Sequence, residues 1–138
     1  MSHVYNVIDQ GALNRLLRSA EGAVAKDMLR RGIKVESRAK QLVSSNPSRV
    51  RTGRLRSSIT HQLVMSGGVP VCRVGTNVVY ARFVHDGTGL YGPRHRMIVP
   101  VNKKVLRWRG KGGWVYSRRS RGMVKNEFLK NALSAAVG

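Results

Sequence analysis

Residues 10–45 of the chain read QGALNRLLRSAEGAVAKDMLRRGIKVESRAKQLVSS. Apolar side chains recur in this stretch at the spacing of one helix face, namely Leu13, Leu16, Leu17, Ala20, Val24, Met28, Val35, Ala39 and Leu42. The stretch therefore predicts a long amphipathic helix that begins the fold, and the rest of the chain must cover its apolar face.

The borders of this helix are marked by residues that start and stop helices. Asp9 stands at the N-cap position, and Ile8 and Leu13 occupy the two positions of a hydrophobic staple. Asn46-Pro47 ends the helix, because a proline disfavours helical conformation in the residue before it. An unbroken helix of this length would measure about 50 Å, so part of it projects or packs on another subunit, unless Gly32 divides it in two.

Glycine turns divide the middle of the chain into strand-like segments. After a basic loop at residues 48–56, the segments 59–65 and 69–75 flank Ser66-Gly67-Gly68, and this pattern predicts a hairpin. Residues 97–101 are also strand-like.

A second hairpin is expected further along the chain. Residues 105–109 are strand-like, and the turn at 110–113 (GKGG) leads into a strand over 114–116. Leu106 and Trp108 share one strand face, and Trp114 and Tyr116 share one face of the next strand, so cross-strand aromatic and aliphatic pairs would stabilise the hairpin.

Two further helices complete the predicted fold. Asn77 is a candidate cap for a short helix over residues 78–84, with the side chains of Val79, Phe83 and Tyr80 toward the core. Asn126 is a candidate N-cap for a last helix, whose apolar stripe comprises Phe128, Leu129, Ala132, Leu133 and Ala136. The order of elements predicts a single α+β domain over residues 1–138, with an extended basic loop and hairpin at 87–125.

The charge of the chain indicates an anionic partner. The chain has 26 Lys and Arg against 6 Asp and Glu, a formal net charge of +20. Residues 37–126 hold nineteen of the basic residues and one acid, Asp86, so this segment alone carries +18. Nucleic acid, a membrane surface or an acidic protein could neutralise it. No apolar run approaches the roughly 20 residues that span a bilayer, Cys72 is the only cysteine, and no signal peptide is recognisable, so an intracellular protein without membrane contact is expected.

His85-Asp86, followed by Gly87-Thr88-Gly89, is the sharpest candidate for chemistry. Asp-Gly-Thr-Gly resembles the turn of aspartic proteases, but those enzymes need two carboxylates that share a proton. The segment 87–92 approaches a dinucleotide-binding glycine pattern, yet Pro93 follows where a helix should open. The four histidines lack metal-ligand spacing. We therefore expect no catalytic residue, cofactor or metal, and the pair would fix or charge an assembly contact.

The basic residues remain the candidate site. They surround aromatic side chains, a pattern that suits either docking on acidic subunits or contact with nucleic-acid phosphates. The candidate contacts for assembly or DNA phosphate are Arg49, Arg51, Arg54, Arg56, Asp86, Arg94, Arg96, Arg107, Arg109, Lys111, Arg118, Arg119 and Arg121.

The order of four motifs resembles the neck and tail-component family of long-tailed bacteriophages. These motifs are RTGRLRSSI at 51–59, VGTNVVYARFVHDGTG at 74–89, the Ile98-Val99-Pro100 strand, and NEFLKNAL at 126–133. The family commonly has a glutamate before Gly-Thr, where this chain has His85-Asp86.

The resemblance implies a structural role at the head–tail junction. It implies a homo-oligomeric ring, with six subunits expected, that joins the connector of the DNA-filled capsid to the tail tube in the virion, after assembly in the host cytoplasm. The neighbours would be head-completion or connector proteins and tail-tube proteins, with nonspecific contact to genomic DNA. A tail terminator ring, a nonspecific nucleic-acid-binding protein and an enzyme that uses His85 and Asp86 are the alternatives.

Overall fold

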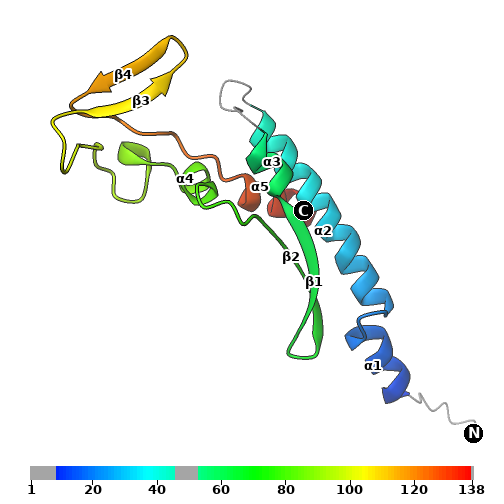
Figure 1. Ribbon diagram of the computed structural model, residues 1–138. Helices are drawn as coiled ribbons and strands as arrows, with labels where there is room; N and C mark the ends of the chain where they lie inside the picture. Colours follow the sequence, from blue (N-terminus) through cyan, green and yellow to red (C-terminus); the bar gives the residue numbers. More distant parts are fainter. Residues whose placement is uncertain (1–8, 46–52, 138) are drawn as a thin grey trace, which may run out of the picture.

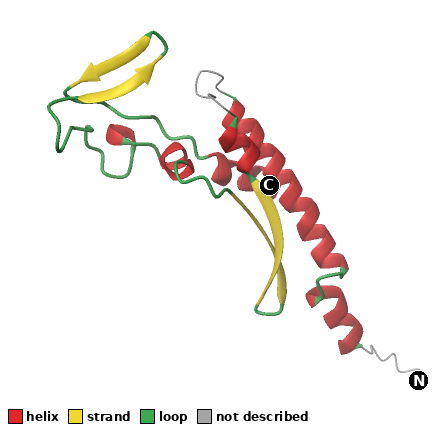
Figure 2. Ribbon diagram, in the orientation of Figure 1, coloured by secondary structure: helices red, strands yellow, loops and turns green. Residues whose placement is uncertain are grey.

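The computed structural model describes residues 9–45 and 53–137 of the chain. The elements are α1 (Gln10–Arg18), α2 (Ala23–Ser44), α3 (Arg54–Ser58), β1 (Thr60–Ser66), β2 (Val69–Gly75), α4 (Ala81–Asp86), the 3-10 turn η2 (Gly89–Tyr91), β3 (Leu106–Gly110), β4 (Gly113–Ser117) and α5 (Phe128–Val137). β1 pairs with β2 and β3 pairs with β4, each as a two-stranded antiparallel sheet. The predicted α+β class and both predicted hairpins are confirmed (Figure 2).

Helix α2 is the element on which the domain is built. α5, α3 and the β1–β2 hairpin all pack along it, and α1 continues beyond its N-terminal end. The β3–β4 hairpin lies far from α2, at the end of an extended double segment (Figure 1). We call residues 87–125, which leave the domain after α4 and return before α5, the arm.

The N-terminal helix is broken, but not at Gly32. Asp9 Oδ1 accepts from the amides of Gly11 and Ala12, so the predicted N-cap is confirmed. The helix then stops at Arg18, because Ser19 is extended (ψ 142°). Gly22 packs so closely on α1 that an added Cβ would lie 2.5 Å from the Arg15 carbonyl oxygen. The break therefore depends on Gly22, whereas Gly32 lies inside α2.

Gly32 brings α2 and β2 into close contact. A Cβ at this buried residue would lie 2.1 Å from Cys72 Sγ, so the thiol fills the space that a side chain would need. Burial raises the pKa of the Cys72 thiol, which keeps it neutral as a packing group.

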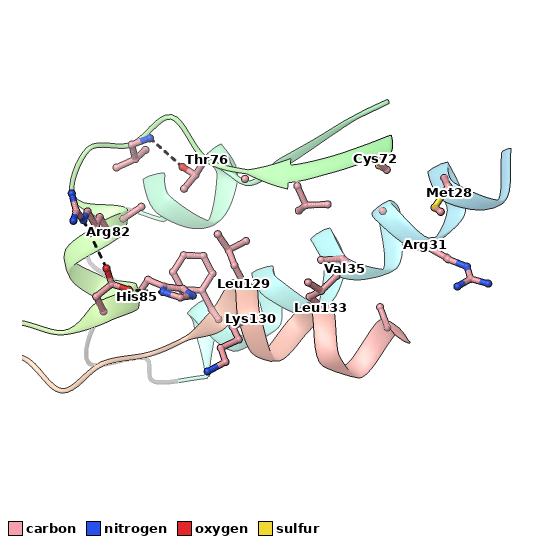
Figure 3. Close-up of a pocket in the computed structure, with 18 of the residues that line it drawn as sticks. Met28, Arg31, Val35, Cys72, Thr76, Arg82, His85, Leu129, Lys130 and Leu133 are labelled. Carbon is pink, nitrogen blue, oxygen red and sulfur yellow. Dashed lines mark hydrogen bonds and ion pairs between the residues drawn. The ribbon is translucent and has the colours of Figure 1, made fainter. Parts of the chain in front are cut away.

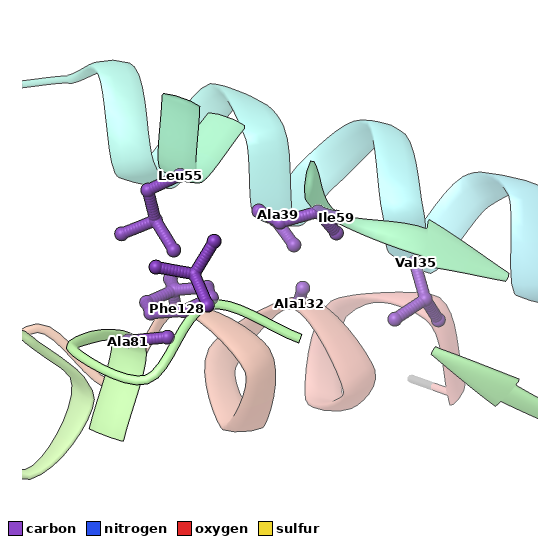
Figure 4. Packing of buried hydrophobic residues seen from close by; sticks show 8 residues of the cluster. Val35, Ala39, Leu55, Ile59, Ala81, Phe128 and Ala132 are labelled. Atoms are coloured by element: carbon purple, nitrogen blue, oxygen red, sulfur yellow. The ribbon is translucent and has the colours of Figure 1, made fainter. Parts of the chain in front are cut away.

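The hydrophobic core lies where α5 closes over α2. Phe128 and Ala132 of α5 are fully buried and meet Ala39 of α2 and Ile59, which are also fully buried (Figure 4). Leu55 of α3 and Ala81 of α4 complete this cluster, as Figure 4 shows beside Phe128. The core therefore joins α2 to α5, the last helix of the domain.

The predicted inward face of the short middle helix is wrong. The helix begins at Ala81 rather than at Val78, and Thr76 Oγ1, not Asn77, accepts from the Val78 amide. Val78 and Ala81 are buried, while Val79 is 85% exposed and Phe83 is 53% exposed. Tyr80 is exposed as well. The larger side chains point outward because α5 already fills the core with Phe128.

Three further local predictions need correction. Part of the predicted basic loop at 48–56 is helix α3. Residues 97–101 form no strand beyond one bridge between Ile98 and Ser120. Helix α5 begins at Phe128, and the Asn126 side chain donates to the Leu42 carbonyl of α2. Ile8 and Asn46-Pro47, which carried the staple and stop predictions, lie outside the described residues.

Substitutions at two positions on α5 should differ greatly in their effect on the free energy of unfolding. Phe128→Ala should lower the free energy of unfolding by about 3–5 kcal/mol, because it opens a cavity among residues with no exposure. In the single chain, Leu133→Ala should cost less than about 1 kcal/mol, because Leu133 is 55% exposed there. Urea unfolding of both variants measures this, and equal losses would contradict the packing of α5.

Gly32 predicts a destabilising glycine-to-alanine change inside a helix. In an exposed helix this change stabilises by about 1 kcal/mol. Here the overlap with Cys72 should reverse the sign and cost about 1–3 kcal/mol. Thermal unfolding of Gly32→Ala with and without Cys72→Ala tests the contact, since the second change should recover part of the loss. A stabilised Gly32→Ala variant would disprove close packing of α2 on β2.

Candidate functional site

The base of the arm is a crossing of two backbone segments. Thr88 N and Leu90 N donate to the carbonyls of Met123 and Arg121, at 2.9 and 2.8 Å. The Met123 amide in turn donates to Thr88 Oγ1 at 2.8 Å. The entering and leaving segments are thus bonded to each other where the arm meets the domain.

Glycines permit this crossing. Gly89 (φ 63°) and Gly122 (φ 86°) both adopt left-handed conformations. A Cβ at Gly89 would lie 2.3 Å from the Arg121 carbonyl oxygen, and one at Gly122 would lie 2.2 Å from that of Thr88. The Gly87-Thr88-Gly89 motif therefore serves a close backbone contact, which accounts for its glycines without a phosphate ligand.

His85 and Asp86 lie beside this crossing and are bonded within their own chain. His85 Nδ1 and Asp86 Oδ1 are 2.9 Å apart, and Asp86 Oδ2 lies 3.8 Å from Arg82 Nε. The His85 ring meets Phe128 edge to face, with ring centroids 5.4 Å apart. The histidine thus packs on the core, and the carboxylate links two turns of α4.

A second half-buried carboxylate ties α2 to the first hairpin. Glu36 bonds Lys40 on its own helix at 2.6 Å and His61 Nδ1 on β1. The bond from Lys40, followed by that from His61, holds the pKa of Glu36 below its ordinary value. Because the folded-state pKa is depressed, these bonds stabilise the fold at neutral pH, and their contribution is lost as the pH falls through that pKa.

The far end of the arm is a twisted ribbon with two distinct faces. Arg107 pairs with Tyr116 and Arg109 pairs with Trp114, so these four side chains share one face. The guanidinium of Arg107 lies 4.5 Å from the Trp114 ring centroid, and that of Arg109 lies 5.9 Å away. Trp108 pairs with Val115 on the opposite face, so Leu106 and Trp108 do not share a face with Trp114 and Tyr116.

The structure separates the predicted basic site residues into groups. Arg54 and Arg56 belong to α3, on the domain. Arg94 and Arg96 line a hollow of about 740 Å³ together with Asp86, at the base of the arm. The ribbon and its flanks hold Arg107, Arg109, Lys111, Arg118 and Arg119, whereas Arg121 lies at the crossing at the base of the arm. Arg49 and Arg51 lie outside the described residues.

An apolar groove on the domain was not predicted from the sequence. It has a volume of about 840 Å³ and is lined by residues of α2, β2, α4 and α5, among them Met28, Val35 and Leu133 (Figure 3). Arg31, Arg82 and Lys130 place cations at its rim. Val79 and Leu133 line the groove and are exposed, although the predicted helix stripes placed both side chains in the core. We call this feature the core groove.

Within residues 9–45 and 53–137, no cluster of three or more His, Cys, Asp or Glu side chains could hold a metal ion. No helix in that part of the chain combines the length and the apolar character required to cross a bilayer.

The fold and surface define a small α+β domain with an exposed apolar groove and a projecting basic arm. A family model described as "Bacteriophage HK97-gp10, putative tail-component" matches residues 10–87. The chain belongs to this family of phage tail components. Searches of curated proteins and of solved structures gave no match. The matched span ends at the first residue of the arm, although the motif resemblance continued to residue 133.

The glycine crossing predicts a selective effect on the arm. Gly122→Ala should break the contact with Thr88 and accelerate amide exchange at Thr88, Leu90 and Met123, while the core amides of α2 keep their protection. Gly112→Ala, at the ribbon tip where nothing lies within 4 Å of an added Cβ, is the matched control. Hydrogen exchange followed by mass spectrometry measures both, and unchanged exchange in Gly122→Ala would contradict the crossing.

Proposed function

We propose that this chain is a structural virion protein that forms a ring at the phage head–tail junction. In this role it is not an enzyme, and it joins the connector of the filled capsid to the tail tube. Membership of the tail-component family supports a virion role. Its neighbours would be connector or head-completion proteins on one side and tail-tube proteins on the other.

The observation that carries the ring is the core groove. It is open and mainly apolar, and Val79 and Leu133 at its lining are more than half exposed in the single chain. Exposed apolar surface of this kind marks sites of protein association. A second copy of the chain is the proposed occupant, since one interface repeated head to tail closes into a ring. Six subunits are expected from the family resemblance.

His85 and Asp86 at the core groove need no polar partner from another chain. His85 and Asp86, which line it, already bond each other, and Asp86 is also paired with Arg82. Their role in this proposal is to hold α4 against α5 beside the groove, because His85 packs on Phe128. A tail terminator ring is the alternative, and it would use the same interface.

Assembly of the purified chain tests the proposal. Native mass spectrometry should detect a closed oligomer, with six subunits as the expected number. Leu133→Asp should shift the chain to monomer, because an unpaired charge would be buried in the apolar interface. Asn131→Asp adds the same charge at an exposed position of the same helix and should leave the oligomer intact.

Two outcomes would contradict the ring. One is a wild-type chain that stays monomeric at every concentration and salt condition tested. The other is a Leu133→Asp variant that assembles as the wild type does, which would remove the core groove from the interface. Circular dichroism of each variant shows that the fold is retained.

A further inference from the structure

The arm carries positive charge that the chain itself does not neutralise. Residues 87–125 contain eleven Lys and Arg and no Asp or Glu. Lys125 lies 3.5 Å from Glu127. Of the ten other cations, none has a carboxylate partner within residues 9–45 and 53–137, which include all six Asp and Glu side chains of the chain. The charge of the arm is therefore available to an anion from outside the chain.

A second copy of the chain is a poor source of that charge. Four of its six carboxylates are already ion-paired internally, namely Asp27, Glu36, Asp86 and Glu127. The Asp9 carboxylate caps α1, so Glu21 is the one carboxylate left that could pair with the arm of another copy. Each copy also carries a net charge of +20, so contact between an arm and another copy would be repelled. The partner of the arm is an anion of another kind.

The ribbon is built to present guanidinium groups. Trp114 lies under Arg107 and near Arg109, so the ring face holds both cations in place. A guanidinium that stacks on a ring keeps its in-plane N–H groups available for oxygen atoms. Trp114 and Tyr116 are more than half exposed, so this face is open to a ligand.

Shape favours duplex DNA over an acidic protein. Two paired strands lie about 4.8 Å apart, and five residues span about 17 Å. A two-stranded ribbon of this size fits the B-DNA major groove, which is about 12 Å wide. Further cations flank the ribbon at Lys103, Lys104, Arg118 and Arg119, where phosphate walls would lie. A duplex offers about one charge per 1.7 Å, so an arm with cations along its whole length needs no matched set of carboxylates.

We propose that the arm binds duplex DNA without base-sequence preference, with the β3–β4 ribbon in the major groove and its arginines on phosphates. This proposal concerns the single chain and does not depend on ring closure. In a ring at the head–tail junction, the arms would contact the DNA that passes through.

Fluorescence anisotropy with a labelled random-sequence duplex of about 25 base pairs tests the proposal on the full chain. We expect binding at 50 mM salt with a steep loss of affinity as salt rises. The Arg107→Ala/Arg109→Ala variant should bind more weakly, and the magnitude of its salt slope should fall by about 2. Arg30→Ala/Lys34→Ala, which removes the same charge from exposed positions of α2, should leave the slope unchanged.

Four results would overturn the proposal. They are no binding at 50 mM salt, equal effects of the two double variants, tighter binding to single-stranded DNA of the same length, and equal or tighter binding to poly-glutamate. The last result would assign the arm to an acidic protein. Native mass spectrometry of the same samples reports the oligomer, so failure of DNA binding is distinguished from failure of the ring.

Discussion

The placement of the arm on the domain depends on one backbone contact, the crossing of Gly87–Leu90 with Arg121–Met123. This contact fixes where the chain leaves the domain and where it returns. Because the return point is fixed, the Asn126 amide reaches the Val84 carbonyl and Phe128 enters the core directly afterwards. The core can therefore close although the arm separates α4 from α5 along the chain. Glycines allow the two segments to touch at the crossing, since any Cβ at Gly89 or Gly122 would overlap the opposing backbone.

This arrangement divides the molecule into two surfaces with different physical character. The domain closes a small core and leaves the core groove open beside α5, so its exposed surface is partly apolar. The arm has no acidic residue and ends in a ribbon that displays stacked arginines. Apolar surface favours association with a similar copy, whereas unneutralised charge disfavours it. One chain can thus assemble through its domain while its arm contacts a polyanion.

The elements with local signals could be predicted from the sequence, but those set by distant contacts could not. Helical spacing predicted α2 and α5, and glycine turns predicted both hairpins. The outward face of Val79 and Phe83 follows from Phe128, which arrives only after the arm. The role of Gly89 depends on Gly122, in a segment some 35 residues away along the chain. Charge identified the basic residues, but strand register decided that Arg107, Arg109 and Trp114 share a face. The core groove left no sequence signal except apolar residues in excess of what the core could bury.

We propose that this chain forms a ring at the head–tail junction through its domain, with the arms directed at DNA. A cryo-electron microscopy map of the intact phage particle tests it most directly. We expect a closed ring between capsid connector and tail tube, with the core groove at the subunit contact and the β3–β4 ribbon toward the central channel. A particle that lacks the protein, or a ring whose ribbons point to the outer surface, would contradict it.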